Sequence, residues 1–474
     1  MHVSHHRPRA ARRLIDDLDF SAIREEIGVP GPFPESVLAE AADNLTVPGP
    51  ARDATDVPFV TIDPPGATDL DQAVFIERRG DGWQVHYAIA DVGSWVGPGS
   101  LVDAEARLRT QTFYSPDLRV PLHPPVLGEQ AASLLPDGPR PAVIWSIGVD
   151  GDGATESVQV ERATIRSRAQ LTYQQVQDDI DAGNPPEPIA ELPALGAALL
   201  ADARRRDAID LGLPEQQVEV DPDGRWTVTL RADLPVEHWN AQISLLTGRA
   251  AAGLMVEAGF GILRTLPAAD RDVVPRLRAA AASLGIPWPD RTHPGALLAD
   301  LDTSRPRHAA LAELAAELLR GAAYTAFDGA LPDDPGHAGI GGPYAHVTAP
   351  LRRLVDRFGL EISLMVHDGR TIPDWLRGAL VDLPGDMARG DSLHRQLDRA
   401  VVDATEAYVL AHRVGETFEA AVVETGDDWG TVALDEPAAR GRCDTPQLPL
   451  GEVIHVRCTV ADVAERMVRF ERTS

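Results

Sequence analysis

The sequence predicts an α+β fold in which a mixed β-sheet with packed helices is followed by a small all-β, OB-like barrel. Short β-type runs separated by turns occupy residues 57–92. Ala/Leu-rich helical patterns fill about residues 165–330, and β-type runs return from about residue 414. We therefore expect three parts: a helical N-terminal extension at 1–50, a main domain at 51–411 and the barrel at 412–474.

The N-terminal half predicts two short helices followed by a β-meander. Residues 11–46 carry apolar residues near helical spacing (Leu14, Ile15, Leu18 and Ile23), and a VPGPFP break precedes a second run from Pro34 to Leu45. The runs VPFVTID (57–63), AVFIERR (73–79) and WQVHYAIADV (83–92) are typical of strands. Asp81-Gly82 marks the hairpin turn between the last two.

The second half predicts helices and then the barrel. Helical patterns include PALGAALLADARRRDAI and RHAALAELAAELLRGAAYTAF. The tail then holds the strand-like runs TFEAAVVET, WGTVALDE, VIHVRCTVADV and RMVRFER. Several short strands in such a length favour an OB-like barrel, which commonly binds single-stranded nucleic acid. The alternative is another small β-domain that caps the core.

Composition indicates a soluble globular chain. Of its 474 residues 44% are apolar, and no run approaches the eighteen or so apolar residues of a membrane span. No apolar segment follows the first residues, so we expect a cytoplasmic protein without membrane contact, and a monomer. The two cysteines, Cys443 and Cys458, are too few for a Cys₄ zinc site and are expected to be reduced core residues.

The charge balance argues mildly against a nucleic-acid partner. The net charge is −28, so positive charge must be concentrated locally if RNA is to bind. All 44 basic residues are arginine, which a GC-rich coding bias explains without any function. Specific motifs must therefore carry a functional assignment.

The segment TIDPPGATDLDQAVFIE brings carboxylates together. Asp63 ends a strand, and a stiff PPGA loop returns the chain at Asp69 and Asp71. Like charges at close range are costly unless a cation neutralises them, and hard oxygen ligands suit Mg²⁺. Magnesium held in this way can polarise a phosphodiester. The alternative is an ordinary solvated acidic turn.

A second segment, HAGIGGPYAHVTAPLRRLVDRFG, predicts a helix that Thr348 caps and that starts near Pro350. Arg352 and Arg353 would then lie in the first turn, where backbone N–H groups already favour an anion, which suggests an external phosphate. The alternative is an ordinary charged helix in which Asp356 pairs with one of the arginines. His346, beside a Gly-Gly turn, is a candidate phosphate contact or a structural histidine.

Together these segments resemble the RNB catalytic domain of the ribonuclease II/R family. TIDPPGATDLDQAVFI matches the family's TIDP-to-aspartate loop, and IADVGSWV (89–96) matches a following family segment. TFYSPDLRVPLHPPVL matches a Tyr-Leu-Pro-like stretch loosely, and YAHVTAPLRRLVD matches the late arginine signature. The resemblance covers roughly residues 50–400 and is more specific than any single motif.

The resemblance implies a 3′→5′ exoribonuclease that hydrolyses single-stranded RNA to nucleoside 5′-monophosphates with Mg²⁺, or with Mn²⁺ as an alternative ion. Its implied catalytic residues are Asp71, Asp69 and Arg352. Its implied metal ligands are Asp63, Asp69, Asp71 and Gln72. Its implied RNA contacts are Tyr114, Tyr173, Arg352, Arg353 and His346, with the tyrosines stacking on bases.

Three departures from the family pattern qualify these expectations. Gln72 stands where the family has a fourth aspartate, which implies weaker metal binding. Only 56 residues precede Val57, too few for tandem cold-shock domains, so a compact form is expected. Thr247 stands where the family has an asparagine. Two alternatives stay open: a catalytically impaired RNB-fold protein that binds RNA, or a phosphodiesterase for short oligonucleotides.

Overall fold

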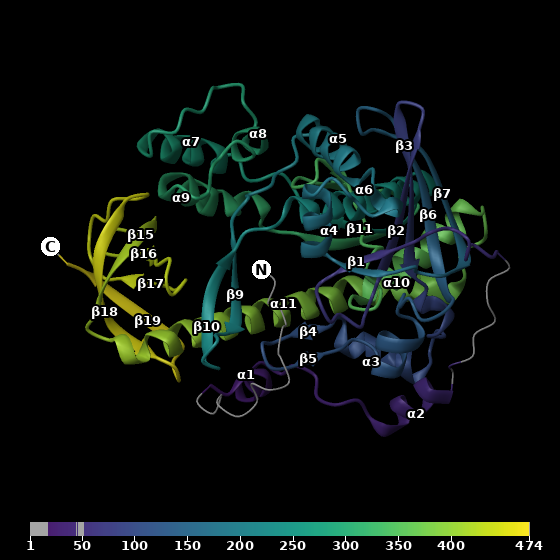
Figure 1. The fold of residues 1–474 in the computed structure, drawn as a ribbon, viewed down its shortest axis with the longest axis horizontal. Coiled ribbons are helices and arrows are strands. Elements are labelled where there is room, and N and C mark those ends of the chain that lie inside the picture. Colours follow the sequence, from purple (N-terminus) through teal and green to yellow (C-terminus); the bar gives the residue numbers. More distant parts are fainter. Residues whose placement is uncertain (1–17, 44, 46–51, 474) are drawn as a thin grey trace.

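A four-stranded antiparallel sheet forms one end of the molecule. The computed structural model describes residues 18–43, 45 and 52–473. The strand order is β2-β3-β6-β7, seen at one end of the ribbon (Figure 1). Their bounds are β2 (Gln72–Arg79), β3 (Gly82–Ala90), β6 (Arg140–Val149) and β7 (Thr155–Ile165). The expected hairpin is present: Arg79 pairs with Gly82, so the loop between them is Gly80-Asp81.

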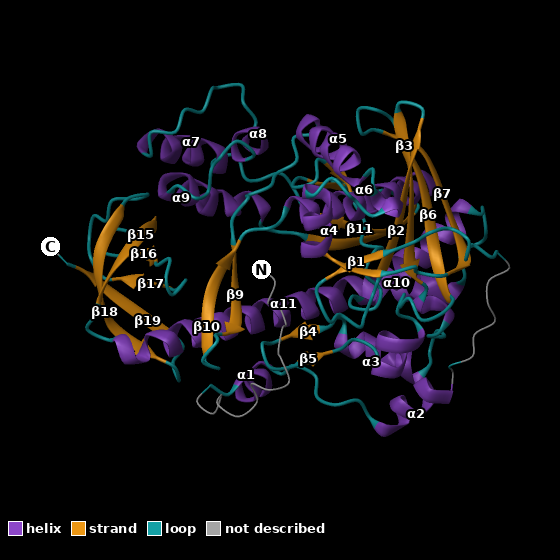
Figure 2. Ribbon diagram, in the orientation of Figure 1, coloured by secondary structure: helices purple, strands orange, loops and turns teal. Residues whose placement is uncertain are grey.

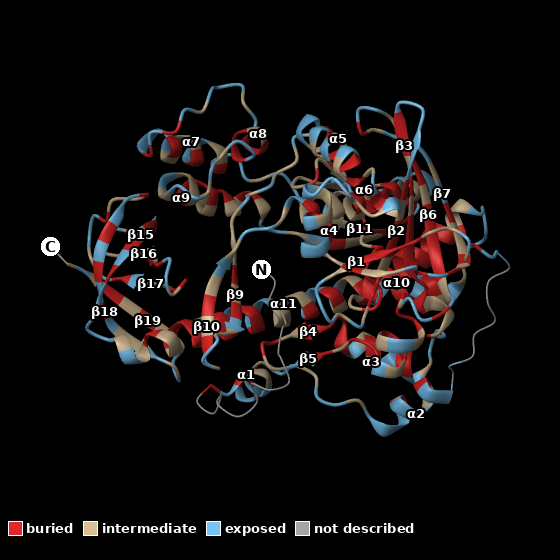
Figure 3. Ribbon diagram, in the orientation of Figure 1, coloured by how far each residue is buried: buried red, intermediate tan, exposed pale blue. Residues whose placement is uncertain are grey.

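Both faces of this sheet are covered. Alternate residues of β3 enter different cores: Val85, Tyr87 and Ile89 join the larger one, and Ala88 and Ala90 join the second. The larger core is completed by helices, which Figure 2 shows beside the sheet. They include α4 (Tyr173–Asp181), α5 (Leu192–Arg205), α6 (Pro235–Ala258) and α10 (Leu354–His367). Figure 3 shows the buried residues concentrated in this region.

The predicted meander is confirmed only in part for its first strand: Val60, just before this strand, pairs antiparallel with Val74 of β2 through two backbone hydrogen bonds. β1 (Thr61–Asp63) pairs in parallel with β8 (Gln170–Thr172) and lies outside the four-stranded sheet. The reason is that β1 needs a partner from a distant part of the chain, which a local pattern of alternation cannot reveal. The pairing of Asp63 with Thr172 brings the start of α4 beside Asp63.

The helical patterns are confirmed in part. The first expected run corresponds to α5, and the second contains α9 (Pro306–Ala315). However, the end of that run, around Tyr324, is strand β12 (Ala323–Asp328), which pairs with β11 (Phe260–Thr265). The other elements here are α3 (Leu101–Arg109), α7 (Val273–Ser283), α8 (Pro294–Leu298), β4 (Phe113–Tyr114), β5 (Arg119–Val120), β9 (Glu215–Val220), β10 (Trp226–Arg231), β13 (Gly336–His337) and β14 (Gly342–Pro343).

The C-terminal barrel is confirmed. Five strands close in the order β15-β16-β17-β19-β18. They are β15 (Thr417–Thr425), β16 (Gly430–Ala433), β17 (Arg440–Cys443), β18 (Val453–Asp462) and β19 (Met467–Arg472). Cys443 and Cys458 are free and buried in its core, as expected. Closure pairs every strand and leaves no open sheet edge.

Helix α11 (Asp374–Leu410) connects the two ends of the molecule (Figure 1). Its 37 residues span about 55 Å at the usual rise per residue. It contacts β12 in the main domain, β10 in the middle and β18 and β19 in the barrel. No helix among residues 18–43 and 52–473 is long and apolar enough to cross a membrane.

The expected N-terminal helices are α1 (Phe20–Ile27) and α2 (Glu35–Asp43). Leu14 and Ile15, which contributed to that expectation, lie outside the described residues. α1 is anchored at three places. Phe20 packs edge-on against Trp226, with ring centroids 5.1 Å apart, and Glu26 pairs with Arg466 of the barrel. Its Arg24 binds Ser115 and Asp117, in the turn between β4 and β5.

A buried glutamate joins α11 to the hairpin β9–β10 and the barrel. Glu406 Oε1 accepts hydrogen bonds from Gln216 Nε2 at 2.7 Å and from the Arg440 amide at 2.9 Å. Burial raises the pKa of Glu406 to about 7. The folded chain therefore retains this proton at a pH where the unfolded chain has lost it. The stability that Glu406 contributes is present at low pH and is lost as the pH rises through 7.

We expect Glu406→Gln to stabilise the fold relative to the parent protein as the pH rises from 5 to 8, because glutamine cannot ionise. The relative gain in the free energy of unfolding should reach about 1–3 kcal/mol at pH 8. Urea unfolding at both pH values measures it, with the exposed Glu465→Gln as the control. A gain that does not depend on pH would contradict this assignment.

Candidate active site

The carboxylate loop is held in place by a neighbouring segment. Asp63 ends β1, and Asp71 immediately precedes β2. Between them, the Leu70 amide donates to Ser133 Oγ at 2.9 Å, and Ser133 Oγ donates to the Thr68 carbonyl at 2.7 Å. Gly66 has a φ of +79°, a left-handed conformation that glycine adopts without strain and that allows the tight turn. The loop backbone is therefore fixed before any ligand binds.

Asp71 contacts residues 348–353 (the arginine segment), which lie about 280 residues further along the chain. Its Oδ1 accepts the Leu351 amide at 2.7 Å, and its Oδ2 lies 3.6 Å from Arg352 Nε. Asp71 is 3% exposed, whereas the Arg352 side chain is 39% exposed. The structure thus combines a buried carboxylate with an arginine side chain that solvent can reach, and the roles predicted for these two residues stay predictions.

The predicted helix start at Pro350 is wrong. Helix α10 begins only at Leu354, and Arg353 is its N-cap in an extended conformation. The reason is tertiary: the Thr112 amide donates to the Arg352 carbonyl at 2.9 Å, and the Leu354 amide donates to the Thr110 carbonyl at 2.9 Å. These bonds hold Arg353 extended, after a single turn in which the Arg352 and Arg353 amides donate to the Ala349 carbonyl. Arg352 therefore lies before the helix and not in its first turn.

Burial shapes the electrostatics of the carboxylates. It raises the pKa of Asp63 to about 7; the nearby Thr61 hydroxyl opposes this rise, and the charge of Asp69 adds to it. Burial also raises the pKa of Asp71 well above its usual value, although Arg352 and the Leu351 amide oppose this rise. Asp63 Oδ2 is buried and has no hydrogen-bond partner in the described part of the chain. Such groups favour a neutralising cation.

Asp69 is engaged with an arginine that sequence reasoning missed. Arg119 Nη1 contacts Asp69 Oδ1, and Arg119 Nη2 lies 2.6 Å from Glu129 Oε1. Within residues 18–43 and 52–473, no three His, Cys, Asp or Glu side chains are grouped closely enough to hold a metal ion. Arg119 lies in the loosely matched stretch TFYSPDLRVPLHPPVL. Arg119 pairs across the strands with Tyr114. This neighbour relation becomes visible only when β4 and β5 are known to pair.

The donor chemistry of the cluster still fits a hard divalent cation. Asp63 offers a buried oxygen without a partner, and the charge of Asp69 acts on both Asp63 and Asp71. Oxygen ligands of this kind suit Mg²⁺. Asp63, Asp69 and Asp71 would hold the ion, and at Asp69 it would compete with Arg119, which already contacts Oδ1. The ligand set stays a prediction.

Gln72 uses its amide nitrogen as a structural donor. Its Nε2 donates to the Thr348 carbonyl, which joins the start of β2 to the arginine segment. An ionised aspartate at this position could not donate that bond. The side-chain carbonyl oxygen remains as the only metal-binding atom of Gln72, so its predicted role as a ligand depends on that oxygen.

Two of the expected RNA contacts are engaged inside the protein. Arg353 donates to Asp356 through Nε at 2.5 Å and Nη2 at 2.8 Å, the pairing that the alternative interpretation allowed. His346 Nδ1 lies 2.7 Å from Tyr324 Oη. Burial lowers the pKa of His346 well below its usual value, and nearby arginines add to this, so it is neutral. Their roles in RNA binding stay predictions.

The two expected stacking residues lie near the carboxylates. Tyr114, in β4, interacts electrostatically with Arg352, Asp69 and Asp71. Tyr173 begins α4 beside Asp63, and Asn240 Nδ2 donates to its hydroxyl at 3.3 Å. Asn240 is another residue that sequence reasoning did not single out, and it begins the stretch NAQISLLTGRAA, which contains Thr247. Thr247 in that stretch donates to the Ile243 carbonyl at 2.9 Å and is fully buried, which is a structural role.

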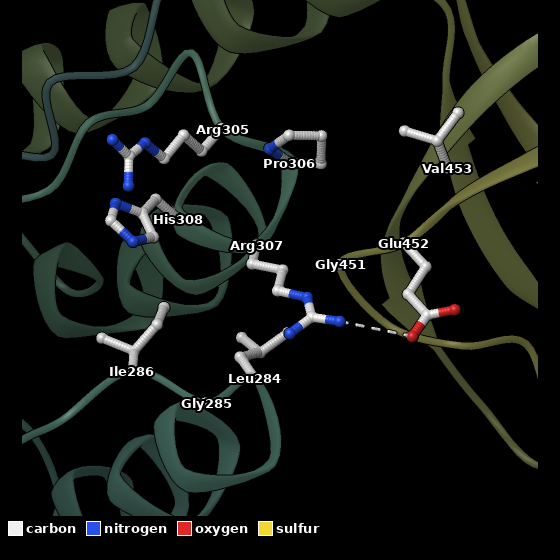
Figure 4. Close-up of a pocket in the computed structure, with 10 residues that line it drawn as sticks. All are labelled: Leu284, Gly285, Ile286, Arg305, Pro306, Arg307, His308, Gly451, Glu452 and Val453. Carbon is white, nitrogen blue, oxygen red and sulfur yellow. Dashed lines mark hydrogen bonds and ion pairs between the residues drawn. The ribbon is translucent and has the colours of Figure 1, made fainter.

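A separate pocket of about 480 Å³ lies between helix α9 and the barrel (Figure 4). Arg307 in its wall lies 3.5 Å from Glu452. None of the candidate catalytic residues lines it, so it is distinct from the carboxylate cluster. Its lining residues are Leu284, Gly285, Ile286, Arg305, Pro306, Arg307, His308, Gly451, Glu452 and Val453.

Comparison with known proteins agrees with this architecture. Residues 51–359 match the RNB domain, and residues 416–473 match the RNase II-type exonuclease C-terminal S1 domain. Ribonuclease R of Aquifex aeolicus is 27% identical, over 95% of this chain and 69% of that protein. Ribonuclease R of Escherichia coli K12 is 28% identical, over 69% of this chain but only 42% of its own length.

The fold itself resembles a solved structure. Mycoplasma genitalium RNase R in complex with ribose-methylated single-stranded RNA superposes with a TM-score of 0.85 at 20% identity. The superposition covers 96% of this chain and 77% of that one. The likeness extends over the main domain and the barrel together.

The ion pair of Arg353 and Asp356 supports the arginine segment, because Asp356 Oδ1 also accepts the Ala349 amide at 2.7 Å. We expect Asp356→Asn to lower the free energy of unfolding by about 3–5 kcal/mol, since it leaves the half-buried guanidinium without its anion. Urea unfolding measures this loss. Asp368→Asn removes an exposed pair with Arg370 and should cost less than about 1 kcal/mol. Equal losses for the two variants would contradict the supporting role of Asp356.

Proposed function

This chain belongs to the RNB family, and on that premise we propose that it hydrolyses single-stranded RNA as an exoribonuclease. The proposal includes 3′→5′ direction, dependence on Mg²⁺ with Mn²⁺ as a substitute, and nucleoside 5′-monophosphates as products. It also includes action as a monomer in the cytoplasm. RNA is the proposed partner because the relatives are ribonucleases.

The observation that carries this proposal is the meeting of Asp71 with the arginine segment. A buried carboxylate that accepts a backbone amide at 2.7 Å is held in one orientation. Beside it, the more exposed Arg352 is accessible to an anionic group that arrives from solvent. Asp71 can hold a metal ion or a water molecule, and Arg352 can bind a phosphate. Together they suit phosphodiester hydrolysis.

Each residue of the site has a proposed task. A divalent cation, when bound by Asp63, Asp69 and Asp71, supplies Lewis-acid activation of water and phosphate. Arg352 stabilises the charge that develops on the scissile phosphate. Tyr114 and Tyr173 stack on terminal bases, which tolerates any sequence. The net charge of −28 makes these local contacts important, because the chain as a whole repels RNA.

A second candidate function is RNA binding without cleavage. It is motivated by Gln72, whose amide is used as a donor to Thr348, and by Asp69, whose carboxylate is engaged with Arg119. Both features reduce the negative charge available to a metal. A phosphodiesterase for short oligonucleotides is a further variant of the enzymatic proposal, distinguished by the length of RNA that is cleaved.

We expect 5′-labelled single-stranded RNA to shorten stepwise from its 3′ end in the presence of Mg²⁺. Asp71→Asn should lower kcat at least about a hundredfold while RNA binding is retained, because it removes an interaction that acts in the transition state. Gel electrophoresis of time points resolves the products, and chelation by EDTA should stop the reaction.

A length series decides between the alternatives. Cleavage of only the shortest oligonucleotides would favour the phosphodiesterase. RNA that stays intact at every length and with either metal, yet is bound, would replace the hydrolase proposal with that of a binding protein. The control variant Asp368→Asn, changed at an exposed position, should cleave RNA at the same rate as the parent protein.

A further inference from the structure

We propose that Arg119 is a built-in counter-ion of Asp69 that competes with a divalent cation for this carboxylate. The inference rests on the proposed metal-dependent function and concerns how the chain controls metal binding at that site. It gives Arg119 the role of a positioning residue, because the side chain acts on Asp69 and not on the substrate.

The guanidinium of Arg119 is held between two carboxylates. Its Nη1 contacts Asp69, and its Nη2 lies 2.6 Å from Glu129 Oε1 and donates to Thr68 Oγ1 at 3.2 Å. The side chains are largely buried, with 22% of Arg119, 16% of Asp69 and 25% of Glu129 exposed. Screening by water is therefore weaker here than for a pair on the open surface.

The surrounding elements fix this arginine. It lies in β5, directly opposite Tyr114 in β4. The turn between these strands is anchored to α1, because Arg24 donates to Asp117 at 2.5 Å and 3.0 Å. Glu129 comes from the short helix η2 (Leu127–Ala131), which precedes the Ser133 that holds the carboxylate loop. Arg119 is thus preorganised beside Asp69.

Electrostatics turns this arrangement into a competition. Asp69 also acts on the carboxylates of Asp63 and Asp71, so a divalent cation bound there would lie close to the guanidinium. Two positive charges that share one carboxylate repel each other. A cation that binds Asp69 competes with Arg119 for the charge of this carboxylate, whether it takes Oδ1 from the guanidinium or binds Oδ2 beside it, and Glu129 remains as the second anion of Arg119. Glu129 therefore favours metal binding at Asp69, because it is a second anion with which Arg119 can pair.

This mechanism predicts effects of opposite sign for the two partners. Removing the charge of Arg119 should strengthen metal binding, because Asp69 becomes free. Removing the charge of Glu129 should weaken it, because Arg119 then depends on Asp69. A purely structural role would disturb the loop in both variants and weaken metal binding in both.

The experiment is a titration of the full-length, RNA-free protein with Mn²⁺, followed by electron paramagnetic resonance of the free ion. We expect Arg119→Gln to lower the Kd for Mn²⁺ about five- to tenfold and Glu129→Gln to raise it at least about twofold. Arg119→Lys keeps the charge and should stay within about twofold of the parent protein. The matched control is Arg276→Gln. Arg276 lies in α7, outside the site, and is also ion-paired with a glutamate, Glu317.

The outcomes separate this inference from the proposed function. If the parent protein binds Mn²⁺ and cleaves RNA but Arg119→Gln binds the ion equally or more weakly, the counter-ion role is overturned and the hydrolase proposal stands. A Kd for Arg119→Lys as low as that for Arg119→Gln would also overturn it, because charge would not be the cause. If the parent protein binds no Mn²⁺ and cleaves no RNA, the metal-dependent function fails and the inference fails with it. Should Arg119→Gln not fold, Glu129→Gln still tests the inference, because a Kd for Mn²⁺ that is unchanged or lower in this variant would overturn it.

Discussion

The hydrogen bond from the Leu351 amide to the buried carboxylate of Asp71 joins two segments that lie 280 residues apart. The rest of the site depends on it, because it brings the carboxylate loop and the arginine segment to the same place. Nearby bonds reinforce the junction: Gln72 donates to the Thr348 carbonyl, and Thr112 donates to the Arg352 carbonyl. A buried acceptor that loses its donor is costly, so this arrangement resists opening.

The two arginines of the arginine segment have different surroundings although they are adjacent. Arg353 is neutralised by Asp356 and supports the backbone, whereas Arg352 remains accessible beside Asp71. The difference follows from the backbone around them, a turn closed by hydrogen bonds from the Arg352 and Arg353 amides to the Ala349 carbonyl and followed by the extended Arg353 that caps α10. In a helical first turn, both would have been presented near the same end of the helix.

The balance of charge around the carboxylates is unusual for a site expected to hold a divalent cation. Gln72 contributes an amide in place of an anion, and Arg119 brings a positive charge to Asp69. Arg352 approaches Asp71 from the arginine segment. The buried and unpartnered oxygen of Asp63 is the feature that most clearly favours a cation. The site thus contains carboxylates that a cation would stabilise, and arginines of the protein already neutralise part of their charge.

The sequence by itself determined the α+β class, the β2–β3 hairpin and the C-terminal barrel, because alternation and turn residues act over a few neighbouring positions. It also drew attention to Asp63, Asp69, Asp71 and Arg352, through the density of carboxylates and the resemblance of whole motifs. Only the tertiary structure decided that β1 pairs in parallel with β8, that α10 starts at Leu354 and that Asp69 faces Arg119. Each of these features depends on contacts between residues that are distant along the chain, and a local pattern carries no record of such partners.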